Sequence, residues 1–309
     1  MSVPLQGAPR IAVHRVVAAA AFALLVGFGC AQACPSDRPL TVVVPYAAGG
    51  SLDVTTRTLV AALAPRLGRR VDVVDLPGAS GLFAARRVLR APVDGCTLLS
   101  ATISQVGLLP LQNTGAGFAP EQFMAVARTG SVASYLVVSA RSSVHRLSDL
   151  STPGSAWRAG NLGPESLQAL LLQRLERAAR TEFIQVPFAG AAALAQALEG
   201  DHIDLAILAQ PALAGLLPRG QVRIVAGVGQ GEGEPAVAWS GLFAASGTDP
   251  GWAKAVSGAV EQAMADPAVA ASLQRLGVDT RPPSMGFSDE VAQSVAWLRS
   301  MLPPRTGLR

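Results

Sequence analysis

The sequence alternates over most of its length between short apolar runs and longer stretches with helical character. The runs have the length of buried strands, and turn residues separate them from the helix-forming segments. We expect strands at 40–45, 71–75, 97–101, 135–139, 182–187, 203–208 and 222–228, and helices at 51–67, 81–90, 164–179, 190–199, 250–265, 267–276 and 288–302. This alternation indicates βαβ units with parallel sheets, so the chain falls in the α/β class. Its 309 residues suffice for two ordinary domains.

Residues 1–33 have the layout of a secretory signal peptide. A positively charged start precedes an apolar core at 16–29, which is short for a membrane-spanning helix. The following "AQA" offers the small residues that signal peptidase reads, so we expect cleavage after Ala33 and export to the periplasm. A lipoprotein with Cys30 or Cys34 as the lipidated residue is the alternative, although neither cysteine follows the usual leucine pattern.

The charge pattern argues against a nucleic-acid partner. Charged residues make up only 15% of the chain, and the net charge is +4. The arginines are scattered and do not cluster with aromatic residues, as they would on a surface that binds a polyanion.

The residues that catalysis would need are also missing from the sequence. After cleavage only His145 and His202 remain as histidines, and neither stands at metal-ligand spacing from a cysteine. No G-x-S-x-G or G-x-G-x-x-G motif occurs, and no nucleophile stands near a base. We therefore expect no enzyme activity, no catalytic residue, no metal site and no cofactor.

The turn in "VVVPYAAGGSLDV" (42–54) is the strongest candidate for a ligand site. Gly49 and Gly50 let a ligand approach the backbone, and the following helix start offers unpaired N–H groups that favour an anion. Ser51 is expected to cap that helix, and Asp53 lies in its first turn. A tight strand-to-helix turn without a ligand is the alternative interpretation.

Three further turns of this kind follow predicted strands, at 75–81, 159–166 and 186–193. Ligands of open α/β sheets bind beyond the carboxyl ends of the strands. Four such turns, spread over two α/β halves, predict a cleft lined by backbone donors.

These segments resemble the substrate-binding proteins of tripartite tricarboxylate transporters, also called Bug receptors. The resemblance starts at "CPSDRPLTVVVPYAAGGSLDV" and continues through "PGASG", "APVDGCTLL" and "VPFAGAAALAQALEGDHIDLAI". It ends with "WSGLFAASGTDP" and the helical segment after it, so it covers almost the whole mature chain.

The resemblance implies a type II periplasmic-binding-protein fold, with two α/β domains around a ligand cleft. Domain 1 would comprise 34–130 and 238–309, and domain 2 would comprise 131–237. Such receptors hold a small carboxylate through backbone N–H groups, act as monomers and deliver the ligand to the membrane components of a transporter. The candidate ligand-binding residues are Tyr46, Ala47, Ala48, Gly49, Gly50, Ser51, Asp53, Gly78, Ser80, Thr102, Ser104, Asn161, Gly163, Phe188, Ala189 and Gly190. A sensor that signals through a membrane sensor kinase is the alternative function.

The chain departs from the family pattern at several of these turns. Ser80 stands where a glycine is common, Glu165 replaces a histidine-containing turn, and Phe188 replaces a tyrosine. The segment 229–238 is also shorter by about twenty residues than the resembled family leads one to expect. The ligand could therefore differ from that of relatives, or bind more weakly.

Cys34 and Cys96 are the two cysteines left after cleavage. Both stand where the resembled family usually has tyrosine, and this fold places the first and third strands side by side. In an oxidising compartment such a pair commonly forms a disulfide, which we predict here. Two free thiols, or lipidation at Cys34, are the alternatives.

Overall fold

A computed structural model describes residues 33–151, 155–229, 236–282 and 284–302. The predicted signal peptide lies outside the described residues except for Ala33, and most of the shortened segment does so too. Among the described helices, none has both the length and the apolar character that crossing a membrane requires.

The described strands form one 10-stranded mixed sheet with the order β2-β1-β3-β9-β4-β7-β5-β6. Two further strands, β8 and β10, pair with β4. The strands are β1 (Leu40–Val44), β2 (Val71–Asp75), β3 (Thr97–Thr102), β4 (Phe123–Ser139), β5 (Ala156–Asn161), β6 (Glu182–Pro187), β7 (Leu205–Ala209), β8 (Val222–Gly227), β9 (Ala236–Ala245) and β10 (Val278–Asp279).

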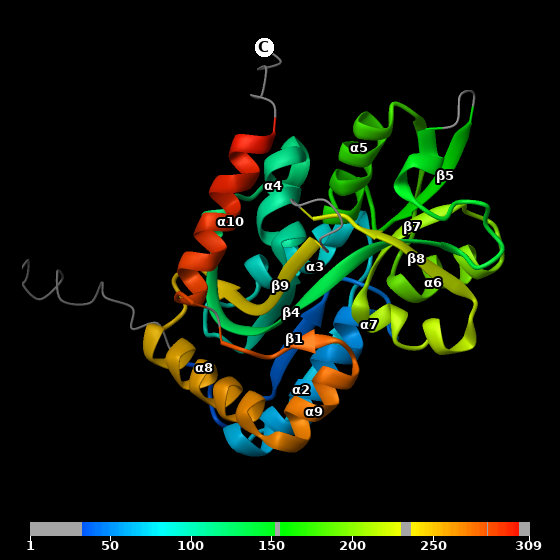
Figure 1. Ribbon diagram of the computed structural model, residues 1–309. Coiled ribbons are helices and arrows are strands. Elements are labelled where there is room, and N and C mark those ends of the chain that lie inside the picture. The colour runs from blue at the N-terminus through cyan, green and yellow to red at the C-terminus, as the bar shows by residue number, and fades with distance from the viewer. Residues whose placement is uncertain (1–32, 152–154, 230–235, 283, 303–309) are drawn as a thin grey trace, which may run out of the picture.

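The helices lie on both faces of the sheet, so its strands are buried on two sides (Figure 1). They are α2 (Ser51–Leu67), α3 (Leu82–Arg90), α4 (Leu109–Gln112), α5 (Leu167–Ala179), α6 (Ala191–Glu199), α7 (Gln210–Leu213), α8 (Pro250–Ala265), α9 (Pro267–Arg275) and α10 (Phe287–Met301).

Alternation along β1 explains how the sheet buries both faces. Val42 packs in one core cluster with residues of α2 and α8, such as Leu63 and Val260. The next residue, Val43, packs in another with residues of α3 and α10, such as Val88. Successive side chains of a strand point to opposite faces, which accounts for the continuous apolar run in the sequence.

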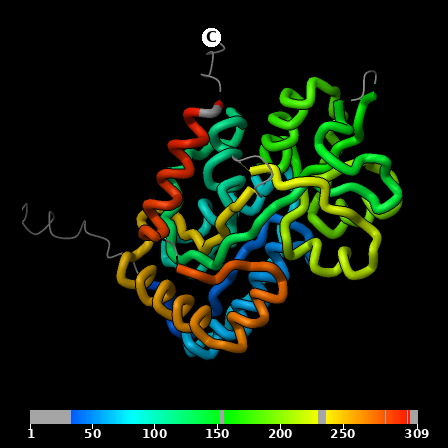
Figure 2. The backbone as a smooth tube through the Cα atoms, viewed as in Figure 1, coloured from blue at the N-terminus to red at the C-terminus, as the bar shows by residue number. Residues whose placement is uncertain are grey.

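The molecule has two lobes, which we define by their parallel strands. The first lobe is built on β1, β2 and β3, and the second on β5, β6 and β7; each of these two sets is internally parallel. The long antiparallel strands β4 and β9 run between the lobes (Figures 1 and 2). Ser131 pairs with Trp239 and Val132 with Ala238, so the two expected domain crossings lie side by side.

The first and third strands are parallel neighbours, and the sulfur atoms of Cys34 and Cys96 are bonded at the start of these strands. The predicted disulfide is therefore confirmed. It joins positions 62 residues apart in the sequence, and the two α-carbons are 4.9 Å apart, within the range that a bridge requires.

Several predicted boundaries differ from the observed ones. The run at 135–139 is only the end of β4, and β5, β9 and β10 have no counterpart among the expected strands. Pro267 starts α9 as expected, but Pro164 lies before α5, whose N-cap is Ser166. The Ser166 side chain accepts a hydrogen bond from the Ala169 N–H, so a hydroxyl cap defines this helix start.

Candidate functional site

The glycine turn after β1 is held by Asp53, which is buried at 3% exposure. Its carboxylate accepts a hydrogen bond from the Gly49 N–H at 2.8 Å and pairs with Arg57 at 2.5 Å. Gly50, not Ser51, is the N-cap of α2, so the expected capping role of Ser51 is wrong. Ser51 is instead the first helical residue, and Asp53 orders the turn.

Arg57 links this turn to the end of β2. Its guanidinium contacts Asp53 and also Asp75, the latter at 2.5 Å. Burial, followed by the charge of Asp53, raises the pKa of Asp75, and the attraction of Arg57 opposes this rise. The three side chains connect the first two carboxyl-end turns of the first lobe.

A small cavity, here called the inner cavity, lies between the lobes and has a volume of about 80 Å³. The first lobe contributes residues of the glycine turn and of the end of β3, and the second contributes residues of α5, α6 and β7. β4 and β9 supply the remaining wall. Its lining residues are Tyr46, Gly50, Ser51, Leu52, Thr55, Thr102, Ser104, Val132, Ser134, Leu162, Leu167, Gln168, Ala191, Ile207, Leu208, Ala209, Pro211, Ala238 and Ser240.

Two residues that line this cavity each have a buried polar atom without a hydrogen-bond partner in the described part of the chain. These atoms are Ser51 Oγ, from the first lobe, and Gln168 Oε1, from the second. A buried polar atom without a partner costs about 1–3 kcal/mol, and such atoms are rare in folded proteins. A hydroxyl can donate or accept, whereas an amide oxygen only accepts, so a polar group in the cavity could satisfy both.

Tyr46 is a third polar group at the cavity and is 8% exposed. Its hydroxyl accepts a hydrogen bond from Gln105 Nε2 at 2.8 Å. Burial raises the pKa of the Tyr46 phenol, and hydrogen bonds with Gln105 and Ser104 oppose the rise. The phenol therefore keeps its proton at neutral pH and can donate it.

A second hollow, here called the outer pocket, has a volume of about 340 Å³. Tyr46 and Leu162 line both the inner cavity and the outer pocket, so the two adjoin. The outer pocket is formed by three of the four turns that the sequence singled out, at 78–81, 162–164 and 187–189, together with Pro45.

Side chains of the two lobes meet directly at this pocket. Glu165 accepts hydrogen bonds from Ser80 Oγ at 2.6 Å and from Asn113 Nδ2 at 3.1 Å. Ser80 itself has a positive φ of 56°, which is uncommon for a residue other than glycine. Glu165, which lies in the turn where the resembled family has a histidine, thus binds the opposite lobe and is not a lining residue of the inner cavity.

Two backbone groups strengthen this contact between the lobes. The Ala47 N–H donates to the Ala189 carbonyl at 3.2 Å, and the Leu167 N–H donates to Ser104 Oγ at 3.0 Å. The Ala47 N–H, a candidate ligand donor, is therefore already occupied, and the Gly49 N–H is bound to Asp53.

The structure divides the candidate binding residues into three groups. Tyr46, Gly50, Ser51, Thr102 and Ser104 line the inner cavity. Gly78, Ser80, Gly163, Phe188 and Ala189 line the outer pocket. Ala47, Ala48, Gly49, Asp53, Asn161 and Gly190 line neither.

The sequence interpretation missed several wall residues of the inner cavity. Gln168, Thr55 and Ser134 are polar examples, and Ala238 and Ser240 of β9 are others. Its place as the second residue of a helix that follows a strand-to-helix turn could have pointed to Gln168. Nothing in a single sequence marks the β4 and β9 residues, because they reach the cavity through tertiary pairing.

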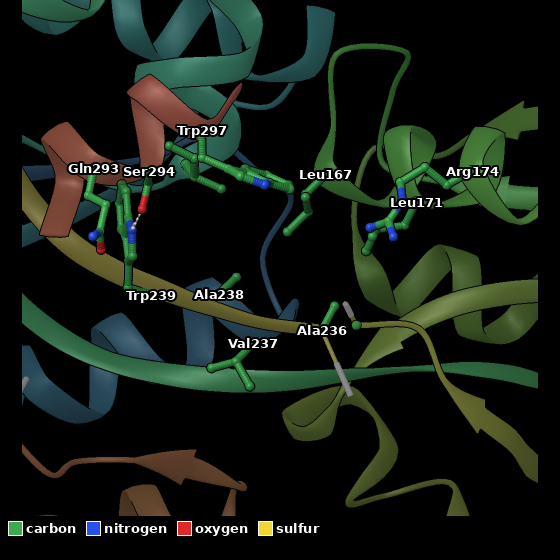
Figure 3. A pocket seen from close by; sticks show the side chains of 12 residues that line it. Leu167, Leu171, Arg174, Ala236, Val237, Ala238, Trp239, Gln293, Ser294 and Trp297 are labelled. Atoms are coloured by element: carbon green, nitrogen blue, oxygen red, sulfur yellow. Dashed lines mark hydrogen bonds between the residues drawn. The ribbon is translucent and has the colours of Figure 1, made fainter. Parts of the chain in front are cut away.

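A third and larger hollow, here called the lateral groove, has a volume of about 620 Å³ (Figure 3). Residues of α5, β9 and α10 line it, and Arg174 is the only charged residue among the described residues that line it. Within the described chain, no group of three or more His, Cys, Asp or Glu side chains could hold a metal ion.

The chain is similar to known solute-binding proteins. The model of the tripartite tricarboxylate transporter family receptor matches residues 55–236. A UPF0065 protein from the tcbD-tcbE intergenic region of Pseudomonas sp. strain P51 is 28% identical over 302 residues, which is 86% of each chain.

Solved structures give the same fold. MatC from Rhodopseudomonas palustris with bound malate superposes with a TM-score of 0.79 at 24% identity, over 85% of this chain and 98% of that one. A second R. palustris protein, solved with adipate, gives a TM-score of 0.76 at 22% identity, over 85% and 95%. The expected two-domain α/β fold is thereby confirmed. Since the family model covers more than half of the sequence, this chain belongs to the tripartite tricarboxylate transporter family receptors.

Proposed function

We propose that the protein is a periplasmic receptor that binds a small carboxylate between its two lobes. The observation that supports this most is the pair of buried atoms without a partner among the described residues, Ser51 Oγ and Gln168 Oε1, which belong to residues that line one cavity from opposite lobes. A carboxylate oxygen of the ligand would accept a hydrogen bond from Ser51 Oγ. A hydroxyl or acid proton of the same ligand would be donated to Gln168 Oε1, so both atoms would be satisfied.

The carboxylate would lie against the start of α2. The N–H groups before Val54 have no partner within the helix, and the positive end of the helix dipole favours an anion. Ser51 Oγ and the protonated Tyr46 phenol add side-chain donors. The proposal thus keeps backbone donors, but it places them at Ser51 and Leu52 and no longer at Ala47 or Gly49.

Such a set of donors is sufficient for useful affinity. Micromolar binding needs about 8 kcal/mol. Each charge-assisted hydrogen bond contributes about 1.5–3 kcal/mol, and the helix terminus up to about 2 kcal/mol. Four such donors reach this range without an arginine in the cavity.

The lobes would be two domains, 34–130 plus 238–309 and 131–237, that close on the ligand. The paired crossings at Ser131–Trp239 and Val132–Ala238 would form the hinge. The malate and adipate bound by two structural relatives support a carboxylate as the ligand. After cleavage behind Ala33, the receptor would act as a monomer and deliver its ligand to the membrane components of a tripartite tricarboxylate transporter.

A thermal-shift screen of the mature protein with malate, adipate, succinate and citrate tests this function. A ligand at 100 times its dissociation constant should stabilise the fold by about 2.7 kcal/mol. Gly50→Val should abolish this stabilisation, because a Cβ there already lies 3.3 Å from the Ala47 carbonyl oxygen and the larger side chain would fill the cavity.

Gly215→Val is the matched control, since an added Cβ at this exposed glycine has no atom within 4 Å. It should leave the ligand-induced shift unchanged. A folded Gly50→Val variant that binds as tightly as the parent would show that the ligand site lies elsewhere.

A further inference from the structure

The lateral groove adjoins the inner cavity. Leu167 and Ala238 line both hollows, one from α5 and the other from β9. The inner cavity measures about 80 Å³, whereas the groove measures about 620 Å³. A ligand longer than a small acid could therefore keep one end in the inner cavity only by extending past Leu167.

One face of α5 lines the groove, and its last lining residue is the positively charged Arg174. Leu167, Leu171 and Arg174 are spaced four and three residues apart, so they share a helix face that spans about 10 Å. No described residue forms a hydrogen bond or ion pair with Arg174, which is half-buried. A guanidinium stays charged at any ordinary pH, so this position presents a permanent positive charge to the groove.

The opposite wall carries two aromatic side chains, Trp239 and Trp297, beside the polar Gln293 and Ser294 of α10. Trp239 is 5% exposed, and its indole N–H donates to Ser294 Oγ at 3.0 Å, so its polar atom is already bonded. Figure 3 shows the Trp297 indole pointing toward Leu167 across the groove. Flat aromatic surfaces of this kind accommodate a methylene chain or a ring.

We propose that the lateral groove binds the far half of an elongated ligand, a dicarboxylate with an apolar body. This inference rests on the proposed function, because the first carboxylate occupies the inner cavity. The body passes between Leu167 and Trp297, and the second carboxylate pairs with Arg174. Gly229 and Ala236 also line the groove, and none of the proposed ligand contacts involves residues 230–235 between them.

The test compares ligands of matched length by titration calorimetry. Succinate and malate probe the inner cavity alone, suberate probes the cavity together with the groove, and octanoate has the length of suberate without the second charge. Suberate should bind about tenfold to a hundredfold more tightly than octanoate, which is the range of one charge-assisted pair. Suberate should also change the tryptophan fluorescence, because Trp239 and Trp297 line the groove.

Arg174→Gln should reduce the affinity for suberate to that for octanoate. Arg177→Gln is the matched control, since Arg177 lies one turn further along α5, is exposed and does not line the groove. It should keep the preference for suberate.

Each outcome is decisive. Equal binding of suberate and octanoate by the parent, or an unchanged preference in Arg174→Gln, would overturn the groove proposal. If succinate or malate still bound in that case, the carboxylate receptor function would stand. If none of the four acids bound to the parent, both proposals would fail together.

Discussion

The two ends of the parallel strands β1 and β3 differ in how they are held together. At the amino ends, the Cys34–Cys96 disulfide joins the segments, and the Thr41 N–H donates to the Cys96 carbonyl at 2.8 Å. At the carboxyl end of β1, the chain turns through Gly49, whose φ is 79°, and Ser51 Oγ has no partner among the described residues. A covalent bond joins the amino ends, whereas the carboxyl ends are joined by hydrogen bonds alone and border the proposed ligand site.

Because of this difference, we expect the two strand ends of the first lobe to affect different quantities, the stability of the fold and the affinity for a ligand. Near the disulfide, the Arg69 guanidinium lies 4.7 Å from the Trp252 ring and donates to the Cys34 carbonyl. Such contacts hold the strand starts together without touching the inner cavity. Changes at the amino ends should therefore alter the free energy of unfolding, and changes at the carboxyl ends should alter ligand affinity.

Removing the disulfide should have the largest effect. The double substitution Cys34→Ser and Cys96→Ser should lower the free energy of unfolding by about 2–4 kcal/mol, because a closed loop in the unfolded chain is lost. Urea denaturation of the two proteins measures this difference. The dissociation constant for a bound carboxylate should stay unchanged, and a tenfold weaker affinity would contradict the separation of the two ends.

Gly163→Ala should have the next largest effect, on the contact between the lobes. Gly163 has a φ of 110°, and an added Cβ would lie 2.3 Å from Ser80 Oγ. The two turns could then not approach as observed, so we expect a larger radius of gyration by small-angle scattering and at least tenfold weaker binding.

Adding Ser80→Gly to this variant removes the nearest clashing atoms and should restore part of the affinity. No restoration would show that the strained backbone at Gly163, and not the contact with Ser80, is responsible. An unchanged radius of gyration in the single variant would contradict closure by these turns.

The sequence alone predicted the strands and the fold class better than it predicted the contacts at the two strand ends. Apolar runs and cysteine number are local properties, so β1 and the α/β class could be predicted from residues alone. The cysteine pairing needed the family resemblance to place the strands side by side. The role of Asp53 as the anchor of the turn could not be read, because it depends on the position of the Gly49 N–H.

Long-range pairing accounts for most of what remained hidden. β9 supplies Ala238 and Ser240 to the inner cavity only because it lies between β3 and β4. Glu165 is one of the departures from the family pattern that could change the ligand or weaken its binding, and the structure shows it bound to Ser80 and Asn113. A residue type and its position along the chain do not specify which opposite turn it will meet.

Ser51→Ala should lower carboxylate affinity by up to about tenfold, since a charge-assisted hydrogen bond would be lost. The unliganded protein should be as stable as the parent or slightly more so, because a buried hydroxyl without a partner is removed. Calorimetric titration and thermal unfolding measure the two effects.

Thr58→Ala serves as the control on the same helix. Its hydroxyl bonds the Val54 carbonyl and does not line the inner cavity. Destabilisation of the unliganded Ser51→Ala protein with unaltered affinity would mean that Ser51 has a structural role only.

Glu165→Gln should have the smallest effect. The carboxylate accepts from Ser80 Oγ and Asn113 Nδ2 with two separate oxygen atoms, whereas an amide has only one acceptor oxygen. The amide can keep both partners only by donating its N–H to Ser80 Oγ, so both bonds between the lobes lose their charge assistance and the unliganded protein closes less readily. Because the ligand must then supply more of the closure free energy, affinity should fall by about two- to threefold.

Hydrogen exchange of the unliganded protein gives a direct measurement of this effect. Exchange should become faster in the turns at 78–81 and 161–166, while the strand starts near the disulfide keep their protection. Glu182→Gln, an exposed position on β6, is the control and should change neither region. Equal exchange of both turns in Glu165→Gln and in the parent would show that Glu165 does not hold the lobes together, and that closure depends on backbone contacts such as Ala47–Ala189.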